Sequence, residues 1–446
     1  MNDRSILTTM ENRRYRAWLL TMLLLTNMFA FVDRQIISVL NQPIKIELGL
    51  TDTELGLLGG MAFAALNCVF SLPIARMSER MNRAKIYGIG IIIWSVATVS
   101  CGFATGFLVL LLARMAVGIG EAAQPAATSL TFDYYPPHQR VAASSILTLA
   151  IPLGVLIGAA GGGIIAEELG WRWAFFIVGT PGILLGILFM TTIREPLRGY
   201  YDPPPQGGEA VPPLSAVVRR ALQRRSYVHV LLGSTLAGAS GFGINVFLAA
   251  YFFRRFGMDF AQSGLISGLI SAIPGAISMF CGGMLANRLA RQDKRFFVLV
   301  PGIGLLLVGP LYLISLLQSD WVIMAILLMI TGLFQYAYLP ASTGVYANIM
   351  EPRMRATSGA IVVIFTSLLG SGAGPLVVGM LSDYFARQNF GADFDVLCAA
   401  NIASQACNQA SADALTTAMM IVALAYIWAA LHFFLAARTI EQDMAD

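Results

Sequence analysis

Long apolar stretches separated by short polar ones recur along the whole chain. A helix that crosses the hydrocarbon core of a bilayer needs roughly 20 apolar residues, because each residue adds about 1.5 Å to a core about 30 Å thick. Stretches of this length, bounded by charged residues, predict twelve membrane spans, which lie near residues 17–41, 53–77, 84–104, 107–131, 141–166, 172–192, 228–252, 261–286, 296–317, 321–347, 357–382 and 413–437.

The pattern within these stretches predicts helices rather than strands. Strands of a membrane barrel alternate polar and apolar residues over about ten positions, and stretches such as Leu19–Leu25 and Val322–Ile330 show no such alternation. The first stretch follows three arginines, as a signal peptide would, but it is longer than the ~7–15 apolar residues of such a peptide. We therefore expect this segment to be retained, and the fold class to be an all-α membrane protein with twelve transmembrane helices.

Composition excludes most soluble classes of protein. Of the 446 residues, 57% are hydrophobic and 12% are charged, against about 25% charged residues in soluble domains. The mean hydropathy is +0.70. A soluble enzyme, a nucleic-acid-binding protein and a disordered scaffold are therefore all excluded.

The motifs of enzymes and ATP-driven pumps are missing from the sequence. None of the three lysines follows a glycine, and no H-E-x-x-H, G-x-S-x-G or G-x-G-x-x-G pattern occurs. The three histidines are scattered, without the spacing of metal ligands. We expect a protein that is not an enzyme and that has no cofactor and no metal site.

The basic residues predict the orientation of the chain. Most of the 29 lysines and arginines fall in the loops on the side of both termini, and such loops are cytoplasmic in membrane proteins. No Asn-x-Ser/Thr glycosylation sequon occurs and the termini are short. We expect a monomeric multi-pass protein of the bacterial inner membrane, with both termini in the cytoplasm.

The chain divides into two related halves. A Pro-, Gly- and Arg-rich stretch, 194–226, separates six spans from six and is typical of a solvated linker with a basic end near the lipid surface. We predict an N-terminal bundle at 1–193, a cytoplasmic linker at 194–226 and a C-terminal bundle at 227–446. Three matches relate the halves in order, namely Gly49–Gly56 with Gly257–Gly264, Arg80 with Arg288, and Pro137–Arg140 with Pro352–Arg355.

Duplicated halves are characteristic of secondary transporters, and several motifs make the comparison specific. Residues 75–85, Ala-Arg-Met-Ser-Glu-Arg-Met-Asn-Arg-Ala-Lys, are similar to the loop signature of the major facilitator superfamily, with Ala75 and Glu79 in place of its glycine and aspartate. Asp33-Arg34 in helix 1 and Gly120-Glu121-Ala122 in helix 4 resemble the Spinster-like branch, which includes lysosomal and sphingolipid transporters. The resemblance implies two pseudo-symmetric six-helix bundles around a central cavity.

Four charged residues lie within the spans, where a charge costs at least ~2.5–3.5 kcal/mol and needs a partner or a wet cavity. Asp33 and Arg34 lie seven or eight residues from the outer end of helix 1, and Arg114 lies at a similar depth in helix 4. The resemblance makes helices 1 and 4 neighbours, so we favour an ion pair between Asp33 and Arg114. Glu121 lies two turns beyond Arg114, near mid-membrane.

Two interpretations of these four charges stay open. They could form a structural ion pair that joins helices 1 and 4. Alternatively, Asp33 and Glu121 bind protons, and Arg34 or Arg114 binds an anionic head group, so that proton and substrate compete. The second interpretation predicts proton-coupled transport.

The second half offers an apolar and aromatic wall with few polar groups. We select Gln335, Tyr336 and Thr366 as candidate substrate contacts, with Asn245, Tyr338 and Ser367 nearby in the pattern. Ionic chemistry in one half and an apolar wall in the other suit an amphipathic substrate. Ordinary helix packing would also explain these residues.

Charged residues at the cytoplasmic loops are candidate gates. The resemblance implies that Glu79 and Arg80 form an inner latch with Arg140, and that Asn287 and Arg288 form a weaker one. Arg83 and Arg355 belong to the same set, and a role in topology alone is the alternative. In the outer loop predicted at 383–412, Cys398 and Cys407 could form a disulfide.

The function expected from the sequence is secondary active transport of an amphipathic, anionic or zwitterionic, lipid-like substrate by alternating access. Its partners would be that substrate, protons and membrane lipids, and not nucleic acid. A drug/proton antiporter, an organic-anion or sugar-phosphate-like carrier, an uncoupled facilitator and a membrane sensor that binds without transport are the alternatives.

Overall fold

The structure is a computed structural model, and it describes residues 10–201, 213–351, 354–391, 394, 397–398 and 405–444. Within these residues all regular structure is helical. In this part of the chain, twelve single helices or runs of two or three consecutive helical segments are long and apolar enough to cross a membrane. The predicted fold class is therefore confirmed.

The first six spans are built from ten helical segments. These are α2 (Arg13–Leu48), α3 (Asp52–Gly56), η1 (Leu57–Met61), α4 (Ala62–Arg80), α5 (Arg83–Cys101), α6 (Phe107–Glu121), α7 (Gln124–Tyr134), α8 (Pro137–Thr148), α9 (Ala150–Glu168) and α10 (Trp171–Thr192).

A short helix, α11 (Leu214–Gln223), precedes the second six spans. These are built from α12 (Arg225–Phe256), α13 (Phe260–Ala290), α14 (Phe296–Leu316), α15 (Trp321–Gln335), α16 (Tyr338–Ile349), α17 (Arg355–Phe365), η2 (Thr366–Gly372), α18 (Ala373–Phe390) and α20 (Gln405–Ala436), and α21 (Ile440–Asp443) follows them.

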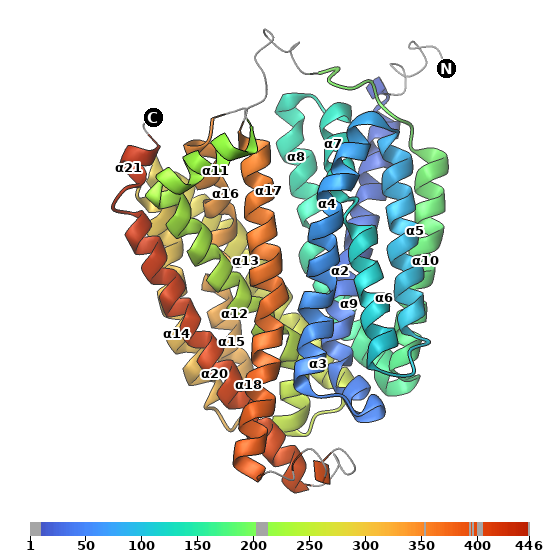
Figure 1. Cartoon of the computed structure of the whole chain (residues 1–446), viewed down its shortest axis with the longest axis vertical. Helices are drawn as coiled ribbons and strands as arrows, with labels where there is room; N and C mark the ends of the chain where they lie inside the picture. The colour runs from blue at the N-terminus through green and yellow to red at the C-terminus, as the bar shows by residue number, and fades with distance from the viewer. Residues whose placement is uncertain are drawn as a thin grey trace.

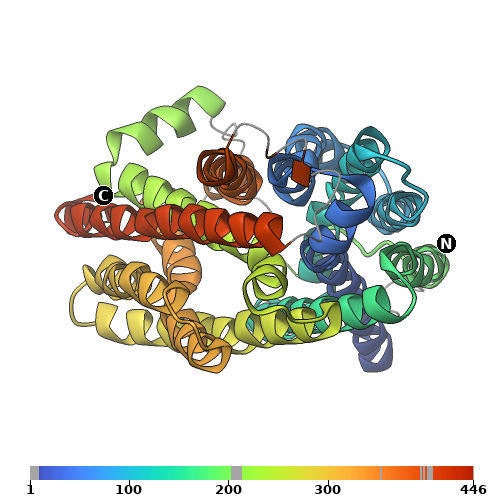
Figure 2. The same cartoon turned by 90° about the horizontal axis from the view of Figure 1, so that it is seen from below.

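The helices gather in two groups, with α2–α10 on one side and α12–α20 on the other (Figures 1 and 2). Both termini lie at one end of the molecule, the upper end in Figure 1, which we call the proximal end. The other end, where α3 lies, is the distal end. Helix α9 packs along α13, α2 packs against α12, and α3 packs against α18, so these three pairs hold the two groups together.

Glycines allow the backbones of the two groups to approach closely. A Cβ added at Gly379 of α18 would lie 2.9 Å from Thr53 Cα, and one at Gly56 would lie 2.9 Å from Leu376 Cα. Gly163 of α9 faces the α13 backbone in the same way. Small residues at such crossings give close van der Waals packing between membrane helices.

Two predicted continuous spans are broken at corresponding places. The fourth span is interrupted between α6 and α7, and the tenth between α15 and α16. Pro125 and Pro340 follow the two breaks, and a proline cannot donate the backbone hydrogen bond that would continue the preceding helix. Each break leaves a polar side chain, Glu121 or Gln335, at the last position of the first segment.

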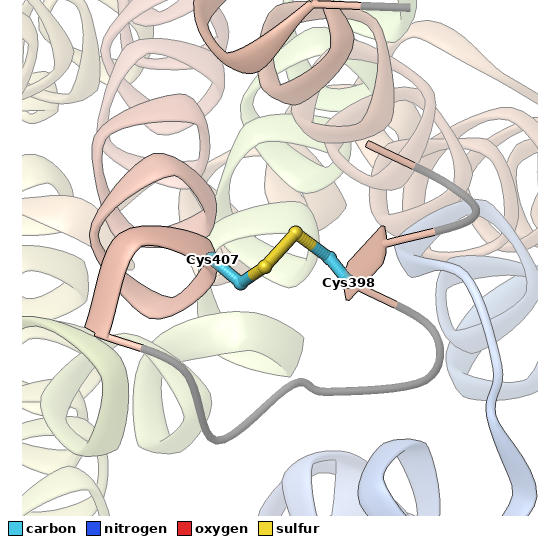
Figure 3. The surroundings of a disulfide bond; sticks show 2 residues. All are labelled: Cys398 and Cys407. Carbon is cyan, nitrogen blue, oxygen red and sulfur yellow. A yellow bond between two sulfur atoms is a disulfide. The ribbon is translucent and has the colours of Figure 1, made fainter. Parts of the chain in front are cut away.

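The predicted outer loop at 383–412 is shorter than expected, because α18 continues to Phe390 and α20 begins at Gln405. Cys398 and Cys407 are joined by a disulfide with a Cα–Cα distance of 5.5 Å. Figure 3 shows that it ties Cys398 to the first turns of α20. The bond lies at the distal end, between the last two spans.

Candidate functional site

The first ion pair of the site lies between α2 and α6 and is sealed from solvent. Arg114 Nη1 lies 3.0 Å from Asp33 Oδ2, and Thr98 Oγ1 of α5 donates to Asp33 Oδ1 at 2.7 Å. Asp33 and Arg114 are each 1% exposed. This is the pairing that the depth estimate favoured, and it links the first, third and fourth spans.

The second ion pair has one buried and one accessible member. Arg34 Nε donates to Glu121 Oε2 at 2.8 Å, and Arg34 Nη2 contacts the same oxygen. The side chain of Glu121 is 4% exposed, whereas that of Arg34 is 40% exposed. The Arg34 guanidinium also lies 4.6 Å from the ring centroid of Phe63 and 5.4 Å from that of Phe31. A cation with aromatic walls therefore covers a buried carboxylate.

One carboxylate oxygen of Glu121 has no hydrogen bond within the described part of the chain. Glu121 Oε1 is buried and has no hydrogen-bond partner among the residues that the structure describes. An unpaired buried carboxylate oxygen is costly, and a proton there would neutralise the group. Protonation would also weaken the hold of Glu121 on Arg34, which could then bind an anion. All four predicted charges are thus paired, but Glu121 binds Arg34 rather than the neighbouring Arg114.

The second half carries a neutral group where the first carries Glu121. Gln335 ends α15 as Glu121 ends α6. Tyr312 donates to Gln335 Oε1 at 2.9 Å, and Gln335 Nε2 donates to the hydroxyl of Tyr426 at 2.8 Å. The two tyrosine rings are stacked, with centroids 5.7 Å apart. Sequence reasoning selected Gln335 but missed this correspondence, which the prolines after the two breaks could have revealed.

The other candidates of the second half are not joined to the four charges. Tyr336 and Gln335 line a cavity of about 10 Å³ together with Asn245 and Ser271, which has room for about one water molecule. The hydroxyl of Thr366 donates to the carbonyl of Val362 in its own span. Among the described residues, no hydrogen bond connects Gln335, Tyr336 or Thr366 to the ion pairs of the first half.

The candidate gate residues lie at the proximal end and are mostly exposed. Glu79 and Arg80 end α4, and Asn287 and Arg288 lie near the end of α13, all with exposed side chains. Two further candidates bind carbonyl oxygens of their own half: Arg140 Nε donates to Phe132 and Tyr135 at 3.0 Å, and Arg355 Nε donates to Met350 at 3.2 Å.

Arg83 differs from the other gate candidates because it is buried within the first half. Its guanidinium lies 2.5 Å from Asp133 Oδ2 and 2.7 Å from Glu195 Oε1. Glu195 and Arg198 both lie in the stretch that follows α10. Arg198 donates to the carbonyl oxygens of Ser78 and Met81, at 2.9 and 2.6 Å. These bonds fasten the chain after α10 to the proximal ends of α4, α5 and α7.

A second charged cluster, at the distal end, joins the two groups of helices. Arg254 of α12 donates to both carboxylate oxygens of Asp52 at 2.7 Å, and Lys45 Nζ lies 2.6 Å from Asp52 Oδ1. Asp383 of α18 accepts from the backbone N–H of Asp52 at 3.0 Å and of Thr53 at 2.8 Å. We call Lys45, Asp52, Arg254 and Asp383 the distal cluster.

The distal cluster is part of a wider closure. Arg254 also donates to Gln42 at 2.7 Å, Asn41 donates to the carbonyl of Val246 at 2.8 Å, and the N–H of Phe260 donates to Glu167 at 2.9 Å. Within the described residues, every hydrogen bond between α2–α10 and α12–α20 lies in this distal part. The described hydrogen bonds therefore join the two groups at the distal end, whereas Glu79, Arg80, Asn287 and Arg288 at the proximal end are exposed.

Sequence reasoning missed the distal cluster because its members lie just outside the predicted spans. A charge near a membrane surface costs little free energy and needs no partner, so the sequence alone does not single out Asp52 or Arg254. The available signal was their position, since Asp52 lies within the repeated Gly49–Gly56 segment and Arg254 lies three residues before Gly257–Gly264.

Comparison with known proteins defines the class. The Major Facilitator Superfamily matches residues 23–375 and 230–434, so the chain belongs to this superfamily of transporters and is not an enzyme. It is 30% identical over 372 residues to an MFS-type efflux pump of Mycolicibacterium smegmatis, covering 82% of this chain and 85% of that protein.

Within the superfamily the chain is Spinster-like. It is 25% identical over 379 residues to a sphingosine-1-phosphate transporter of Danio rerio, covering 80% of this chain and 74% of that protein. A crystal structure of a bacterial homologue of the human lysosomal transporter Spinster, in an inward-facing and unoccupied conformation, matches with a TM-score of 0.88 and 31% identity over 97% of this chain and 99% of that one.

Proposed function

We propose that this protein is a proton-coupled transporter of an amphipathic, anionic or zwitterionic lipid-like substrate. The observation that carries the proposal is the pair of Arg34 and Glu121, in which an accessible guanidinium covers a buried carboxylate with one unpartnered oxygen. A proton bound to Glu121 would take the place of Arg34 as its partner, and an anionic head group bound to Arg34 would take the place of Glu121. The sphingosine-1-phosphate transporter among its relatives supports the substrate class.

The surroundings of Arg34 favour an amphiphile over a small polar anion. Phe31 and Phe63 flank the guanidinium, so the head group would bind beside apolar surface rather than in a polar pocket. In the sealed pair, Asp33 and Arg114 hold α2 against α6 and so position Arg34 and Glu121. We assign proton binding to Glu121 first and to Asp33 only in a state in which its pair is opened. Gln335, Tyr336 and Thr366 stay candidate contacts for the rest of the substrate.

We further propose that the distal end faces the outside and that the structure is an inward-facing state. The excess of Lys and Arg in the proximal loops supports this orientation, and the inward-facing homologue supports the state. Residues 1–193 and 227–446 would rock about the linker 194–226. In the opposite state the distal cluster would open, and Glu79, Arg80 and Arg140 would meet Asn287, Arg288 and Arg355. Arg83 would support this latch by holding α5 to α7.

The test uses purified protein in liposomes loaded with sphingosine-1-phosphate under an imposed pH gradient. Glu121→Gln keeps the size of the side chain and removes its proton, so we expect flux that no longer depends on the gradient, with the melting temperature retained. Glu168→Gln, the same change at an exposed carboxylate, is the matched control and should behave as wild type. Full gradient dependence in Glu121→Gln would refute proton coupling through this residue.

A drug/proton antiporter is the second candidate, because the Mycolicibacterium smegmatis relative is an efflux pump. The same liposomes separate the two. Transport of cationic drugs in place of sphingosine-1-phosphate would favour the antiporter, and Arg34→Gln should then leave drug flux intact. Binding without flux of any probe would indicate a sensor. We expect the protein to act as a monomer in the bacterial inner membrane.

A further inference from the structure

The short helix α11 has an apolar arc that the protein covers only in part. Successive residues of an α-helix are rotated by 100°, so Val217, Ala221, Leu214, Val218 and Leu222 fall on one continuous arc about 140° wide. Val217 and Ala221 are buried, at 0% and 6% exposure, where α11 packs against α12 and α17.

The adjacent half of this arc is uncovered. Leu214, Val218 and Leu222 are 61%, 37% and 68% exposed. They are spaced four residues apart and so form one stripe on the surface of α11. Ser215, Arg219 and Gln223 form a polar stripe that is rotated by about 100° from the apolar one. One half of the apolar arc thus contacts protein, and the other half faces the surroundings.

The location of α11 shows what these surroundings are. Figure 1 shows α11 lying across the proximal end of the second group of helices, and Figure 2 places it at the periphery of the molecule. The segment ends directly at α12, a membrane span that begins at Arg225. Leu222 therefore lies three residues from the start of a span, which would place it near the lipid head groups.

The charge of α11 complements an anionic surface. Residues 214–225 contain four arginines and no acidic residue. Arg220 pairs with Glu351 at 2.9 Å, and Arg224 lies 3.8 Å from Asp443. Arg219 and Arg225 are exposed, and neither forms an ion pair with another described residue. Uncompensated arginines beside an exposed apolar stripe are the pattern of a helix that lies in a membrane interface.

We propose that α11 docks on the anionic lipids of the proximal leaflet, with Leu214, Val218 and Leu222 in the acyl-chain boundary and Arg219 and Arg225 against lipid phosphates. Docking would hold the proximal ends of α12 and α17 at the membrane surface. The proposal rests on the orientation of the spans and not on the transported substrate, so it can fail independently of the proposed function.

The experiment places an environment-sensitive fluorophore on α11 in the full-length protein. Cysteines are introduced by Leu222→Cys and, as the matched control about 100° further round the helix on the polar stripe, by Gln223→Cys. The free cysteines Cys68, Cys101 and Cys281 are first replaced by Ser or Ala. Each protein is reconstituted in vesicles of phosphatidylcholine with and without phosphatidylglycerol. Quenching by lipids brominated on their acyl chains reports the depth of the probe.

We expect the Leu222 probe to be quenched strongly and the Gln223 probe weakly. Phosphatidylglycerol should increase the quenching of the Leu222 probe, because it draws α11 deeper into the interface. Each arginine at an anionic surface favours docking about fivefold, and glutamate in its place is repelled, so the double variant Arg219→Glu/Arg225→Glu should lose at least about thirtyfold in the docked population. High salt should have the same effect on the parent protein.

Equal quenching of the two probes, or insensitivity to phosphatidylglycerol, would overturn the proposal. Shielding of the Leu222 probe that grows with protein density, without quenching by lipid, would overturn it in favour of a second copy of the chain. Variants are compared only if they elute as the parent protein does, and the salt dependence of the parent protein tests the proposal without the charge reversal.

Discussion

Replacing Gly379 by alanine should open the distal end of the molecule. The glycine lies on α18 directly against the start of α3, and a Cβ there would meet the carbonyl oxygen of Asp52, with Asp52 C at 2.6 Å and Thr53 Cα at 2.9 Å. All three are backbone atoms, which cannot rotate away. Normal contact begins near 3.4 Å, so α18 and α3 must separate by about 1 Å.

This separation removes the hydrogen bonds that close the distal end. The distances from Asp383 to the N–H groups of Asp52 and Thr53, now 3.0 and 2.8 Å, would become about 4 Å, beyond hydrogen-bonding range. Hydrogen bonds to a charged group contribute about 1.5–3 kcal/mol each. Losing two should disfavour the closed distal end by about 3 kcal/mol, roughly a hundredfold change in the ratio of the two states.

Distances between pairs of spin labels measure this ratio. Leu169 and Leu317, both exposed and on opposite groups of helices at the distal end, are suitable label positions. Met81 and Gln292 report on the proximal end in the same way. In Gly379→Ala the distal distances should lengthen and the proximal distances shorten.

Gly359→Ala is the matched control, since it lies on the same span and a Cβ there meets nothing within 4 Å. It should give the distances of the parent protein. A Gly379→Ala protein that folds and keeps the parent distances at both ends would refute the reasoning that this glycine permits closure. Gly56→Ala, whose Cβ would lie 2.8 Å from Pro375 C, tests the same contact from the other helix.

Two further predictions concern the buried and the exposed charges. Asp33→Asn leaves the buried guanidinium of Arg114 unpaired and should lower the free energy of unfolding by about 3–5 kcal/mol in thermal unfolding experiments, while adding Arg114→Leu should restore much of it; no loss in the single variant would contradict a sealed pair. Glu79→Ala should raise the population with long proximal distances by up to about fivefold, because an exposed latch contributes at most ~1 kcal/mol. Glu441→Ala, which breaks an exposed ion pair with Arg295 within one half, should not change that population.

The fold could be predicted from the sequence because its main determinants are local. Each span is recognised by its own apolar length, and the repeated segments at Gly49 and Gly257 relate the halves without any knowledge of contacts. The breaks after Glu121 and Gln335 were not predicted, although prolines follow both. A long apolar stretch conceals them, since hydropathy does not depend on backbone continuity.

The site could be predicted only where depth determines the partner. Asp33 and Arg114 lie at a similar depth, and the resemblance to the superfamily makes their helices neighbours, so the pair could be favoured before the contact was seen. Arg34 and Glu121 could not be matched in this way, because the direction of a side chain around the helix decides their contact. Arg254 and Asp52 come from spans 7 and 2, and their contact depends on which end of the molecule is closed. Counting residues from the end of a span gives depth, but it does not give the direction of a side chain or the end of the molecule that is closed.

The hydrogen bonds from α3 to Asp383 make the first turn of this helix depend on the other half of the molecule. The first N–H groups of a helix need acceptors from outside it, and here the acceptor for Asp52 and Thr53 comes from the other half of the molecule. Thr51 and Glu54 form a capping box within the first half, but the N–H groups of Asp52 and Thr53 have this acceptor only while the distal end is closed. Exchange of these two amide hydrogens with deuterium should therefore follow the opening of the transporter, in the unmodified protein and without any label.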